Sequence, residues 1–511
     1  MIRVLLLSIS VLLIIISYPG GAFPLLVSIA IAPALVAVAN LKPFQSAALF
    51  GVWALVWWLA ALWWGIPALT NFSESSGLAS FIIMAGICFT LALPYALSAF
   101  IISYFKLWQS SLGLIQIPLC FAVLISLFST VLPAAPVNAL FEYPILLQWA
   151  DVGGLPLLIF FYFIINASIA STFINKKDGV LKPLVVLFLT VIIVLLYGYY
   201  KLAETGEGDS KQLTIGYIQP SLSPDDHLSD LIAQTSQLKQ YSESLELIIW
   251  PEVPIDFSWQ NKEYERYRIR KLAQEVDAHL LIVPGYHYVN NKNSDDGHYN
   301  SANLISNEGE SLAEYHKQKL VPFFEYLPFK QYLAPYFPNV RNYIAGTEAV
   351  PFSFDQHILA PLICYEALFS DMVRPYVEQG ASIIVNPGND GWFGEVGALS
   401  HLSLTLIRSI EYRLPLIRVN NSGVSTVINH KGEILFNTLT PLGAKAGKVF
   451  TLDVAKNKQT MKGQLLEKSS QTIYYQYGNA INIFAILLLC LFLVHRQRML
   501  TRKKTVCNRY F

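Results

Sequence analysis

Charged side chains are scarce in this sequence. They make up 14% of its 511 residues, whereas about a quarter is usual for a soluble domain. The formal net charge is only +1, so the chain lacks the basic excess that would favour nucleic acid as its main partner. Hydrophobic residues make up 54% and gather in long runs rather than spreading evenly. This composition predicts a mixed protein, in which a membrane α-helical bundle is joined to a water-soluble domain.

The chain also lacks the cysteine and histidine patterns of disulfide-stapled or metal-binding proteins. Its five cysteines form no CxxC pair, and its nine histidines show no HExxH spacing. We therefore expect no disulfide framework and no metal or other cofactor. Three of the cysteines lie in apolar runs and one lies in the basic tail, so Cys364 is the only cysteine of the polar segment 205–475.

Eight apolar stretches approach the length of about 20 residues that a membrane span requires. The alternative interpretation of the first stretch is a signal peptide, because this stretch is short and begins Met1-Ile2-Arg3. No A-x-A site follows it and seven further stretches do, so we interpret it as a retained span. The expected spans cover residues 4–18, 23–40, 47–69, 80–105, 112–135, 154–172, 180–200 and 478–495.

Lysine and arginine are distributed unevenly among the connections between these spans. The connections 19–22, 70–79 and 136–153 contain neither residue type. Since cytoplasmic loops are the ones enriched in Lys and Arg, we expect the N-terminus in the cytoplasm. The basic residues on that side would be Arg3, Lys42, Lys106, Lys176, Lys177, Arg496, Arg498, Arg502, Lys503, Lys504 and Arg509.

This orientation predicts four regions. Residues 1–204 would form a transmembrane bundle of seven spans, residues 205–475 a catalytic domain outside the cytoplasm, residues 476–497 the eighth span and residues 498–511 a basic cytoplasmic tail. In a non-cytoplasmic, oxidising compartment the solitude of Cys364 is protective, because no second cysteine of the same domain can pair with it.

Short β-branched runs alternate with amphipathic stretches from residue 213 onwards. Near-continuous apolar strands that alternate with helices are typical of a layered α/β domain with covered sheets. Strands are expected at 213–218, 245–250, 279–284, 301–306, 358–364, 382–386, 415–420 and 424–429. Helices are expected at 228–241, 263–276, 366–378 and 402–413.

Three residues of this domain have the chemistry of acyl transfer. Glu252 and Cys364 each end an apolar strand, and Lys317 lies between them in the sequence. A free thiol is mostly protonated at neutral pH, so a carboxylate can serve as general base, and an ammonium can stabilise the oxyanion that forms on attack. Each residue alone has a plain structural alternative: a core cysteine, a turn-capping glutamate and a solvated lysine.

The motifs around these residues resemble those of one family. The order Glu252, Lys317, Cys364 resembles the triad of the nitrilase (carbon–nitrogen hydrolase) superfamily. More specific similarity points to its membrane-bound members, the apolipoprotein N-acyltransferase family of Gram-negative bacteria, and covers essentially the whole chain. It rests on the layout of eight spans with the domain before the last, and on the stretches Lys317–Glu325, Cys364–Glu366, Asn389–Gly394 and Gln148–Asp151 with Asn166.

The resemblance implies an α-β-β-α nitrilase-like sandwich on a multi-pass bundle in the bacterial inner membrane, with the catalytic domain in the periplasm. It implies ping-pong N-acylation, the last step of lipoprotein maturation. A phospholipid would donate its sn-1 acyl chain to Cys364 as a thioester. The N-terminal amine of diacylglyceryl-cysteine on a lipoprotein would then accept the chain. No ATP is needed, because the final amide is the most stable acyl product, and we expect the protein to be a monomer.

The same resemblance implies a role for each site residue. In the triad, Glu252 would be the general base, Lys317 the oxyanion stabiliser and Cys364 the nucleophile. The supporting residues would be Glu325, a second carboxylate, and Tyr365 and Glu366, which flank the nucleophile and shape its pocket.

The sequence departs from the family pattern in three places. Phe324 stands where the motif Val-Pro-Phe-Gly-Glu has glycine, and the loop 218–227 replaces the usual Gln-Gly-Asn-Ile and the tryptophan that follows it. The third is Asn386-Pro387-Gly388, where the family usually has a less kinked run. These departures fall on loops expected near the lipid entrance, so the acceptor amine stays open. The alternatives are an acyltransferase for a different amine, a membrane-tethered amidase in which water resolves the thioester, and a catalytically silent lipid-binding scaffold.

Overall fold

The computed structural model divides into two compact units. The first comprises Met1–Trp63, Phe81–Glu204 and Gln471–Phe511, and the second comprises Trp64–Ser80 and Thr205–Ser470. Of the loop 218–227, residues 221–226 lie outside the described part of the chain. The structure describes residues 1–129, 131–174, 179–204, 210–220, 227–242, 244–254, 259–283, 287–288, 297–337, 340, 343–440, 446–455 and 472–507.

The first unit is helical. Its elements are α1 (Ile2–Ser17), η1 (Pro24–Ile29), α2 (Ala32–Val38), α3 (Pro43–Ala61), most of α5 (Gly77–Tyr104), η2 (Leu107–Gln109), α6 (Gly113–Phe128), η3 (Pro136–Leu140), α7 (Pro144–Leu147), α8 (Ala150–Ile174), α9 (Leu181–Ala203) and α16 (Ile473–Cys507). Its chain turns sharply inside α8, where Gly154 has a φ of 62°.

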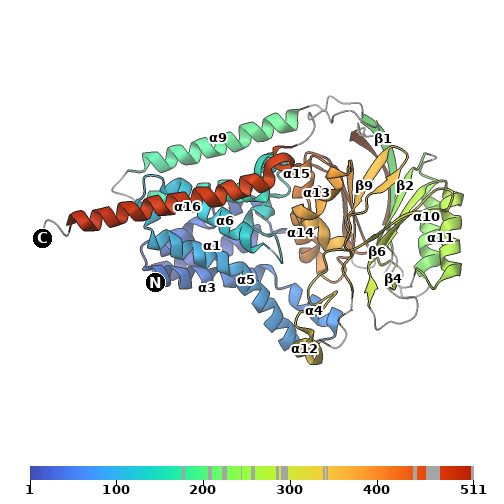
Figure 1. The fold of residues 1–511 in the computed structure, drawn as a ribbon, viewed down its shortest axis with the longest axis horizontal. Helices are drawn as coiled ribbons and strands as arrows, with labels where there is room; N and C mark the ends of the chain where they lie inside the picture. Colours follow the sequence, from blue (N-terminus) through green and yellow to red (C-terminus); the bar gives the residue numbers. More distant parts are fainter. Residues whose placement is uncertain are drawn as a thin grey trace. The chain divides into compact units, whose positions relative to one another are not determined.

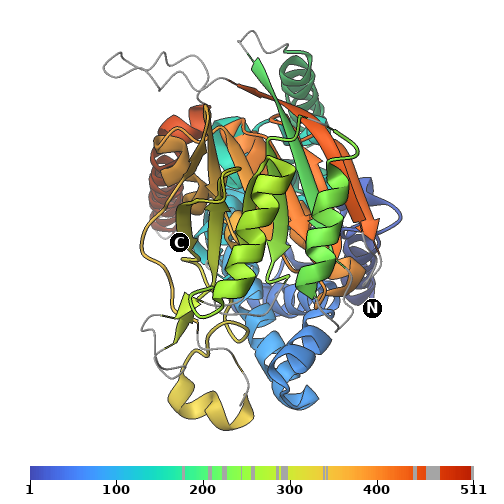
Figure 2. The same ribbon diagram turned by 90° about the vertical axis from the view of Figure 1, so that its right-hand side faces the viewer.

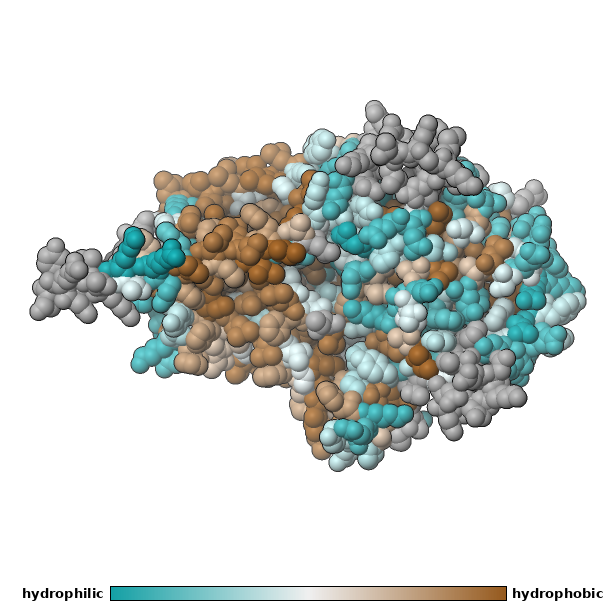
Figure 3. All heavy atoms as spheres, in the orientation of Figure 1, coloured by the Kyte–Doolittle hydropathy of each residue, from teal (hydrophilic) through white to brown (hydrophobic). Residues whose placement is uncertain are grey.

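Five helices among the described residues are long and apolar enough to cross a membrane: α3, α5, α8, α9 and the part Ala480–Arg502 of α16. The expected count of eight is not confirmed, because the apolar helices Ile2–Ser17, Pro24–Val38 and Gly113–Phe128 are shorter. The long helix α9 exposes large apolar side chains such as Phe188 and Leu196, and Figure 3 shows the apolar colouring of this unit. Exposed apolar surface of this extent is suited to contact with lipid, and the protein is membrane-bound.

The expected span 47–69 is wrong in its second half. Helix α3 ends at Ala61, and the next residue, Leu62, has a non-helical φ of −107°. The apolar residues that follow form the separate helix α4 (Gly65–Ser73), which belongs to the second unit. Hydropathy could not distinguish the two fates, because burial in a membrane and burial against a protein domain select the same side chains.

The second unit contains two six-stranded sheets. The first has the order β14-β1-β2-β3-β6-β7 and the second the order β13-β12-β11-β10-β9-β8. In each sheet three central strands are parallel, β1-β2-β3 and β9-β10-β11, and their neighbours are antiparallel. The strands are β1 (Ser210–Gln219), β2 (Leu247–Glu252), β3 (His279–Val283), β6 (Ser301–Ile305), β7 (Ser311–His316), β8 (Phe352–Phe354), β9 (His357–Pro361), β10 (Ile383–Gly388), β11 (Leu416–Asn420), β12 (Gly423–Ile428), β13 (Ile434–Thr440) and β14 (Ala446–Ala455), with a separate pair β4 (His287–Tyr288) and β5 (His298–Tyr299).

Helices cover the outer faces of the two sheets, so the expected α-β-β-α sandwich is confirmed (Figures 1 and 2). Helices α10 (His227–Leu238) and α11 (Glu263–Val276) pack on the first sheet around the fully buried Trp250. The second sheet is covered by α13 (Ser370–Glu378), α14 (Gly394–Thr405) and α15 (Ile407–Tyr412), and the short helices α12 (Lys330–Leu333) and η6 (Ala334–Tyr336) follow β7. Strand β2 faces β10 and β11 across the interior, which brings strand ends of both sheets together.

The strands missed by sequence analysis are the two-residue strands β4 and β5 and the longer strands β7, β8, β13 and β14. Edge strand β7 has the sequence Ser-Leu-Ala-Glu-Tyr-His and is half exposed, so it has no continuous apolar run. The helix expected at 366–378 begins only at Ser370, because residues 364–368 form the 3-10 turn η7 (Cys364–Leu368). The helix expected at 402–413 begins earlier, at Gly394, and its first turn contains Gly397, a residue that usually weakens a helix prediction.

Candidate active site

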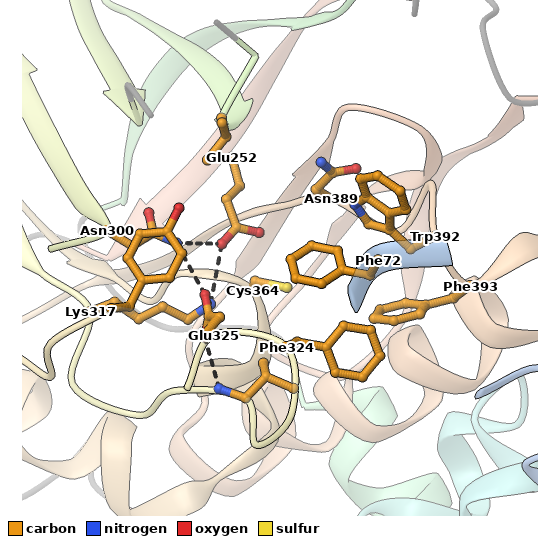
Figure 4. Close-up of a pocket in the computed structure, with 13 residues that line it drawn as sticks. Phe72, Glu252, Asn300, Lys317, Phe324, Glu325, Cys364, Asn389, Trp392 and Phe393 are labelled. Atoms are coloured by element: carbon orange, nitrogen blue, oxygen red, sulfur yellow. Dashed lines mark hydrogen bonds and ion pairs between the residues drawn. The ribbon is translucent and has the colours of Figure 1, made fainter. Parts of the chain in front are cut away.

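A cavity of about 220 Å³ lies in the second unit where strands of both sheets end (Figure 4). Glu252 is the last residue of β2, and Cys364 follows β9. The structure therefore brings Glu252, Lys317, Glu325 and Cys364 to one cavity, whereas Tyr365 and Glu366 do not line it. Its lining residues are Phe72, Glu252, Val253, Asn300, Lys317, Val321, Phe324, Glu325, Tyr343, Cys364, Asn389, Trp392 and Phe393.

Lys317 lies between two carboxylates at the polar end of the cavity. Its side chain is 1% exposed, and its ammonium Nζ lies 2.8 Å from Glu325 Oε1 and 3.2 Å from Glu252 Oε1. Burial alone would lower the pKa of Lys317, but the charges of Glu252 and Glu325 outweigh burial and raise that pKa well above its ordinary value. Lys317 therefore remains a cation, and it is held in place by the two carboxylates rather than lying on a solvated face.

Cys364 is a neutral thiol at rest. Burial raises the pKa of Cys364 well above its ordinary value, and the Glu252 carboxylate raises it further, whereas Lys317 opposes both effects. The two carboxylates around one ammonium leave an excess of negative charge, which disfavours a thiolate. For Cys364 to act as a nucleophile, a base would have to remove the thiol proton. Glu252 is suited to this, because the described contacts of its carboxylate engage Oε1.

The backbone at Cys364 is strained. Its φ of 51° lies in the left-handed region, which costs a non-glycine residue of order 1–3 kcal/mol unless neighbouring contacts hold it. The side chain of Asn386, near the end of β10, donates hydrogen bonds to the carbonyl oxygens of Leu362 (2.6 Å) and Cys364 (3.0 Å). This turn presents the thiol to the cavity, as Figure 4 shows.

Glu366 lies beneath the nucleophile and joins two loops. One carboxylate oxygen accepts hydrogen bonds from the backbone N–H groups of Gln318 (2.6 Å) and Lys319 (3.1 Å) and from the Tyr315 hydroxyl (2.7 Å). The other accepts from the backbone N–H of Ile363 at 2.8 Å. Burial raises the pKa of Glu366 to about 7, although these donors act in the opposite direction. Glu366 thus fixes the distance between the Cys364 turn and the loop after Lys317.

Asparagine side chains complete the site, and sequence analysis missed them. Asn300 donates hydrogen bonds to Glu252 Oε1 (2.8 Å) and Glu325 Oε1 (3.3 Å), and it is 1% exposed. Asn421 donates hydrogen bonds to the carbonyl oxygens of Glu252 and Val253. Each asparagine lies beside an apolar strand, which was the one sequence feature that could have indicated a role. That position does not reveal which strand ends lie together in the fold.

The opposite end of the cavity is aromatic. Phe72, Phe324, Trp392 and Phe393 form what we call the aromatic wall, and in Figure 4 they lie on the other side of the Cys364 sulfur from the charged groups. The departure at Phe324 is accommodated without strain at that residue, because its neighbour Phe323, and not Phe324 itself, has a left-handed φ of 66°. Among the described residues no group of three His, Cys, Asp or Glu side chains could hold a metal ion.

Comparison with known proteins agrees with this geometry. A family model described as carbon-nitrogen hydrolase matches residues 216–451. Over most of the chain, the protein is similar to the apolipoprotein N-acyltransferase of Geobacter metallireducens, with 25% identity covering 91% of this chain and 90% of the relative. Residues 216–451 therefore resemble the carbon-nitrogen hydrolase family. Within it, the resemblance to the apolipoprotein N-acyltransferases that the motifs predicted is confirmed.

One further relative and one solved structure are similar to parts of the chain. The apolipoprotein N-acyltransferase of Rhizobium leguminosarum bv. trifolii is 29% identical, and the match covers 74% of this chain and 75% of the relative. Among solved structures, a carbon-nitrogen hydrolase from Helicobacter pylori G27 is 16% identical with a TM-score of 0.38, and the match covers 47% of this chain and 88% of that one.

Proposed function

We propose that this membrane-bound acyltransferase N-acylates lipoproteins through a thioester on Cys364. A phospholipid is the acyl donor, and the amine of an N-terminal diacylglyceryl-cysteine is the acceptor. The observation that carries the proposal is that Cys364 lies between Lys317, held by two carboxylates, and a wall of aromatic rings. The protein functions as a multi-pass protein of the bacterial inner membrane, and its catalytic unit works in the periplasm.

In the first half-reaction Glu252 takes the proton of the thiol while Cys364 Sγ attacks the ester carbonyl carbon. Negative charge then develops on the carbonyl oxygen. An ammonium has three N–H donors, and the described contacts of Lys317 use two, on Glu252 and Glu325. The third can stabilise the oxyanion. Collapse of the intermediate breaks the ester C–O bond, and Glu252 returns the proton to the leaving oxygen of the lysophospholipid.

In the second half-reaction the acceptor amine attacks the thioester carbonyl. Glu252 takes a proton from the amine, Lys317 again stabilises the oxyanion, and the C–S bond breaks as the proton returns to sulfur. The product is an amide, which is more stable than either the ester or the thioester, so the sequence needs no external energy source.

The test is direct labelling of the protein in detergent or vesicles. Incubation with a phospholipid labelled in its acyl chain should leave a thioester on the wild type and on Cys490→Ala, but not on Cys364→Ala. A diacylated lipopeptide should then remove the label as an amide. Lys317→Ala and Glu252→Ala should each slow labelling by about 10²–10³-fold. A protein that never carries label would refute both enzyme hypotheses, the acyltransferase and the amidase. A label that only water removes would indicate an amidase.

A second test addresses the acceptor. A bacterial strain depleted of its own apolipoprotein N-acyltransferase should grow again when it expresses this protein, and should not grow with Cys364→Ala. Expression of both proteins at equal levels in the membrane is the necessary control. Thioester formation without rescue of growth would indicate a different acceptor amine.

A further inference from the structure

The aromatic wall is a connected set of rings. The Phe72 ring centroid lies 5.1 Å from that of Phe324 and 5.2 Å from that of Trp392. Phe324 also faces Phe393 edge-on at 6.2 Å. Contacts at these distances are typical of favourable aromatic packing. Phe72 and Phe324 each contact two other rings, so these two residues join the wall together.

The wall is built from three distant parts of the chain and is firmly supported. Phe72 comes from α4, Phe324 from the loop after Lys317, and Trp392 and Phe393 from the residues just before α14. Behind Phe393 lies Trp64, with ring centroids 5.2 Å apart. A Cβ atom at Gly397 would come within 2.8 Å of Trp64, so this tryptophan packs directly on the helix backbone and leaves the wall little room to retreat.

The chemistry of the cavity decides which part of a substrate meets this wall. An acyl group bound to Cys364 Sγ must extend away from sulfur, and the other side of the cavity holds Lys317 and two carboxylates. An alkyl chain placed there would remove these charges from their partners or from water at high cost. Each CH₂ group buried against the aromatic rings instead contributes about 0.8 kcal/mol of favourable binding free energy. The wall therefore receives the hydrocarbon next to the acyl carbonyl.

The size of the cavity limits how much hydrocarbon it senses. Its volume of about 220 Å³ is below the ~300–1,000 Å³ typical of pockets that enclose a whole small ligand. Trp392, at one edge of the wall, is 42% exposed, so the remainder of a long chain can leave the cavity past it. The cavity therefore contacts only the part of an acyl chain that lies next to the acyl carbonyl, and it does not enclose the distal end of the chain.

We propose that Phe324 is a specificity-determining residue that selects acyl donors by their cross-section next to the carbonyl. Straight chains fit between Phe324, Phe72 and Phe393, and chains with a methyl branch at the second or third carbon are excluded. This inference rests on the proposed function. It gives a role to the bulky residue found where the motif that this sequence resembles has glycine.

The experiment measures single-turnover thioester formation by intact-protein mass, using synthetic phospholipids that differ only in such a methyl branch. One methyl group in a closely fitting apolar pocket changes the rate by about 10–200-fold, so the wild type should prefer the straight donor at least tenfold. Phe324→Gly should accept both donors at similar rates, and Phe324→Leu should be intermediate. Phe329→Gly is the matched control, because Phe329 is exposed, lies in the same loop and already has a left-handed φ of 51°.

Each outcome has a separate meaning. A wild type without preference, or a Phe324→Gly protein that keeps it, would overturn the inference while leaving the proposed function intact. A Phe324 substitution could instead alter only the step in which a diacylated lipopeptide discharges a preformed thioester. That result would show that the wall holds the acceptor's chains, and it would also overturn the inference. Absence of a thioester with every donor would refute the proposed function, and the inference with it. Circular dichroism spectra and thermal unfolding midpoints close to those of the wild type verify that Phe324→Gly and Phe324→Leu fold.

Discussion

Asn386 Nδ2 lies 3.0 Å from the carbonyl oxygen of Cys364 and donates a hydrogen bond to it. The other end of the same amide accepts a hydrogen bond from Arg418 Nη1 at 2.6 Å. Arg418 is fully buried and is paired with Asp390, at 2.7 Å. The strained turn of the nucleophile is therefore connected, through one amide, to a buried ion pair in the second sheet.

Asn386 is a positioning residue, and its removal should lower the turnover rate more than substrate binding. Asn386→Ala would leave two buried carbonyl groups without their donor, at about 1–3 kcal/mol for each unsatisfied group. We expect kcat for acyl transfer to fall by about 10–100-fold with KM changed less than threefold. Steady-state kinetics on purified protein measures both values. Asn307→Ala is the control, because this half-buried asparagine donates to Asp277 and does not line the cavity; a raised KM with normal kcat would contradict the assignment.

The ion pair of Arg418 with Asp390 should make a large contribution to stability. Burial alone would raise the pKa of Asp390, but the charges of Arg418 and His401 outweigh it and lower that pKa below its ordinary value. The contribution of Asp390 is thus present above the pKa of an unfolded aspartate, and it is lost as the pH falls through the lower pKa of the folded state.

Asp390→Asn tests this role at neutral pH. The substitution leaves the Arg418 charge buried without its anion, which typically costs 3–5 kcal/mol. We expect a clear fall in the thermal unfolding midpoint of the detergent-purified protein, measured by circular dichroism. The same change at exposed Asp371 is the control. An unchanged midpoint in Asp390→Asn would mean that the pair is not a major stabilising contact.

Sequence analysis could predict that Glu252, Lys317 and Cys364 meet, because each of them carries chemistry of its own. Glu252 and Cys364 follow apolar runs, and such strands end where α/β layers gather their functional groups. The same reasoning could not find Asn386, because an asparagine after an apolar strand more often caps a turn. It also could not find Phe72, which hydropathy assigned to the connection 70–79 between two membrane spans. Both depend on contacts between distant segments, which local patterns do not record.

Glu366 should give the protein a pH-dependent stability with a defined sign. Burial raises its pKa to about 7 from an ordinary 4.5, so between these values the folded protein holds a proton that the unfolded chain releases. The contribution of Glu366 is therefore fully present below pH 4.5 and is lost as the pH rises through 7. At about 1.4 kcal/mol per pKa unit the change is on the order of 3 kcal/mol.

The measurement compares the wild type with Glu366→Gln, which cannot titrate. As the pH rises from about 4.5 to 7, the unfolding midpoint of the wild type should fall relative to that of Glu366→Gln. The same substitution at exposed Glu378 serves as the control. A difference that does not change with pH would contradict the role given to Glu366. Since all four described partners of its carboxylate donate hydrogen bonds, the amide should also mispair with one of them and slow thioester formation.

Glu252→Gln should change the reactivity of Cys364 in two opposite directions. The amide keeps an oxygen that can accept from Lys317 and Asn300, but it removes the negative charge that raises the pKa of Cys364. The thiol should therefore ionise more readily and react faster with iodoacetamide at pH 8. Acyl transfer should nevertheless fall by about 10²–10⁴-fold, because the general base is gone. Alkylation is measured by intact-protein mass in a protein that carries both Cys490→Ala and Cys507→Ala, so that neither cysteine of α16 contributes. If alkylation and acyl transfer slowed together, Glu252 would instead be stabilising a thiolate already present at rest.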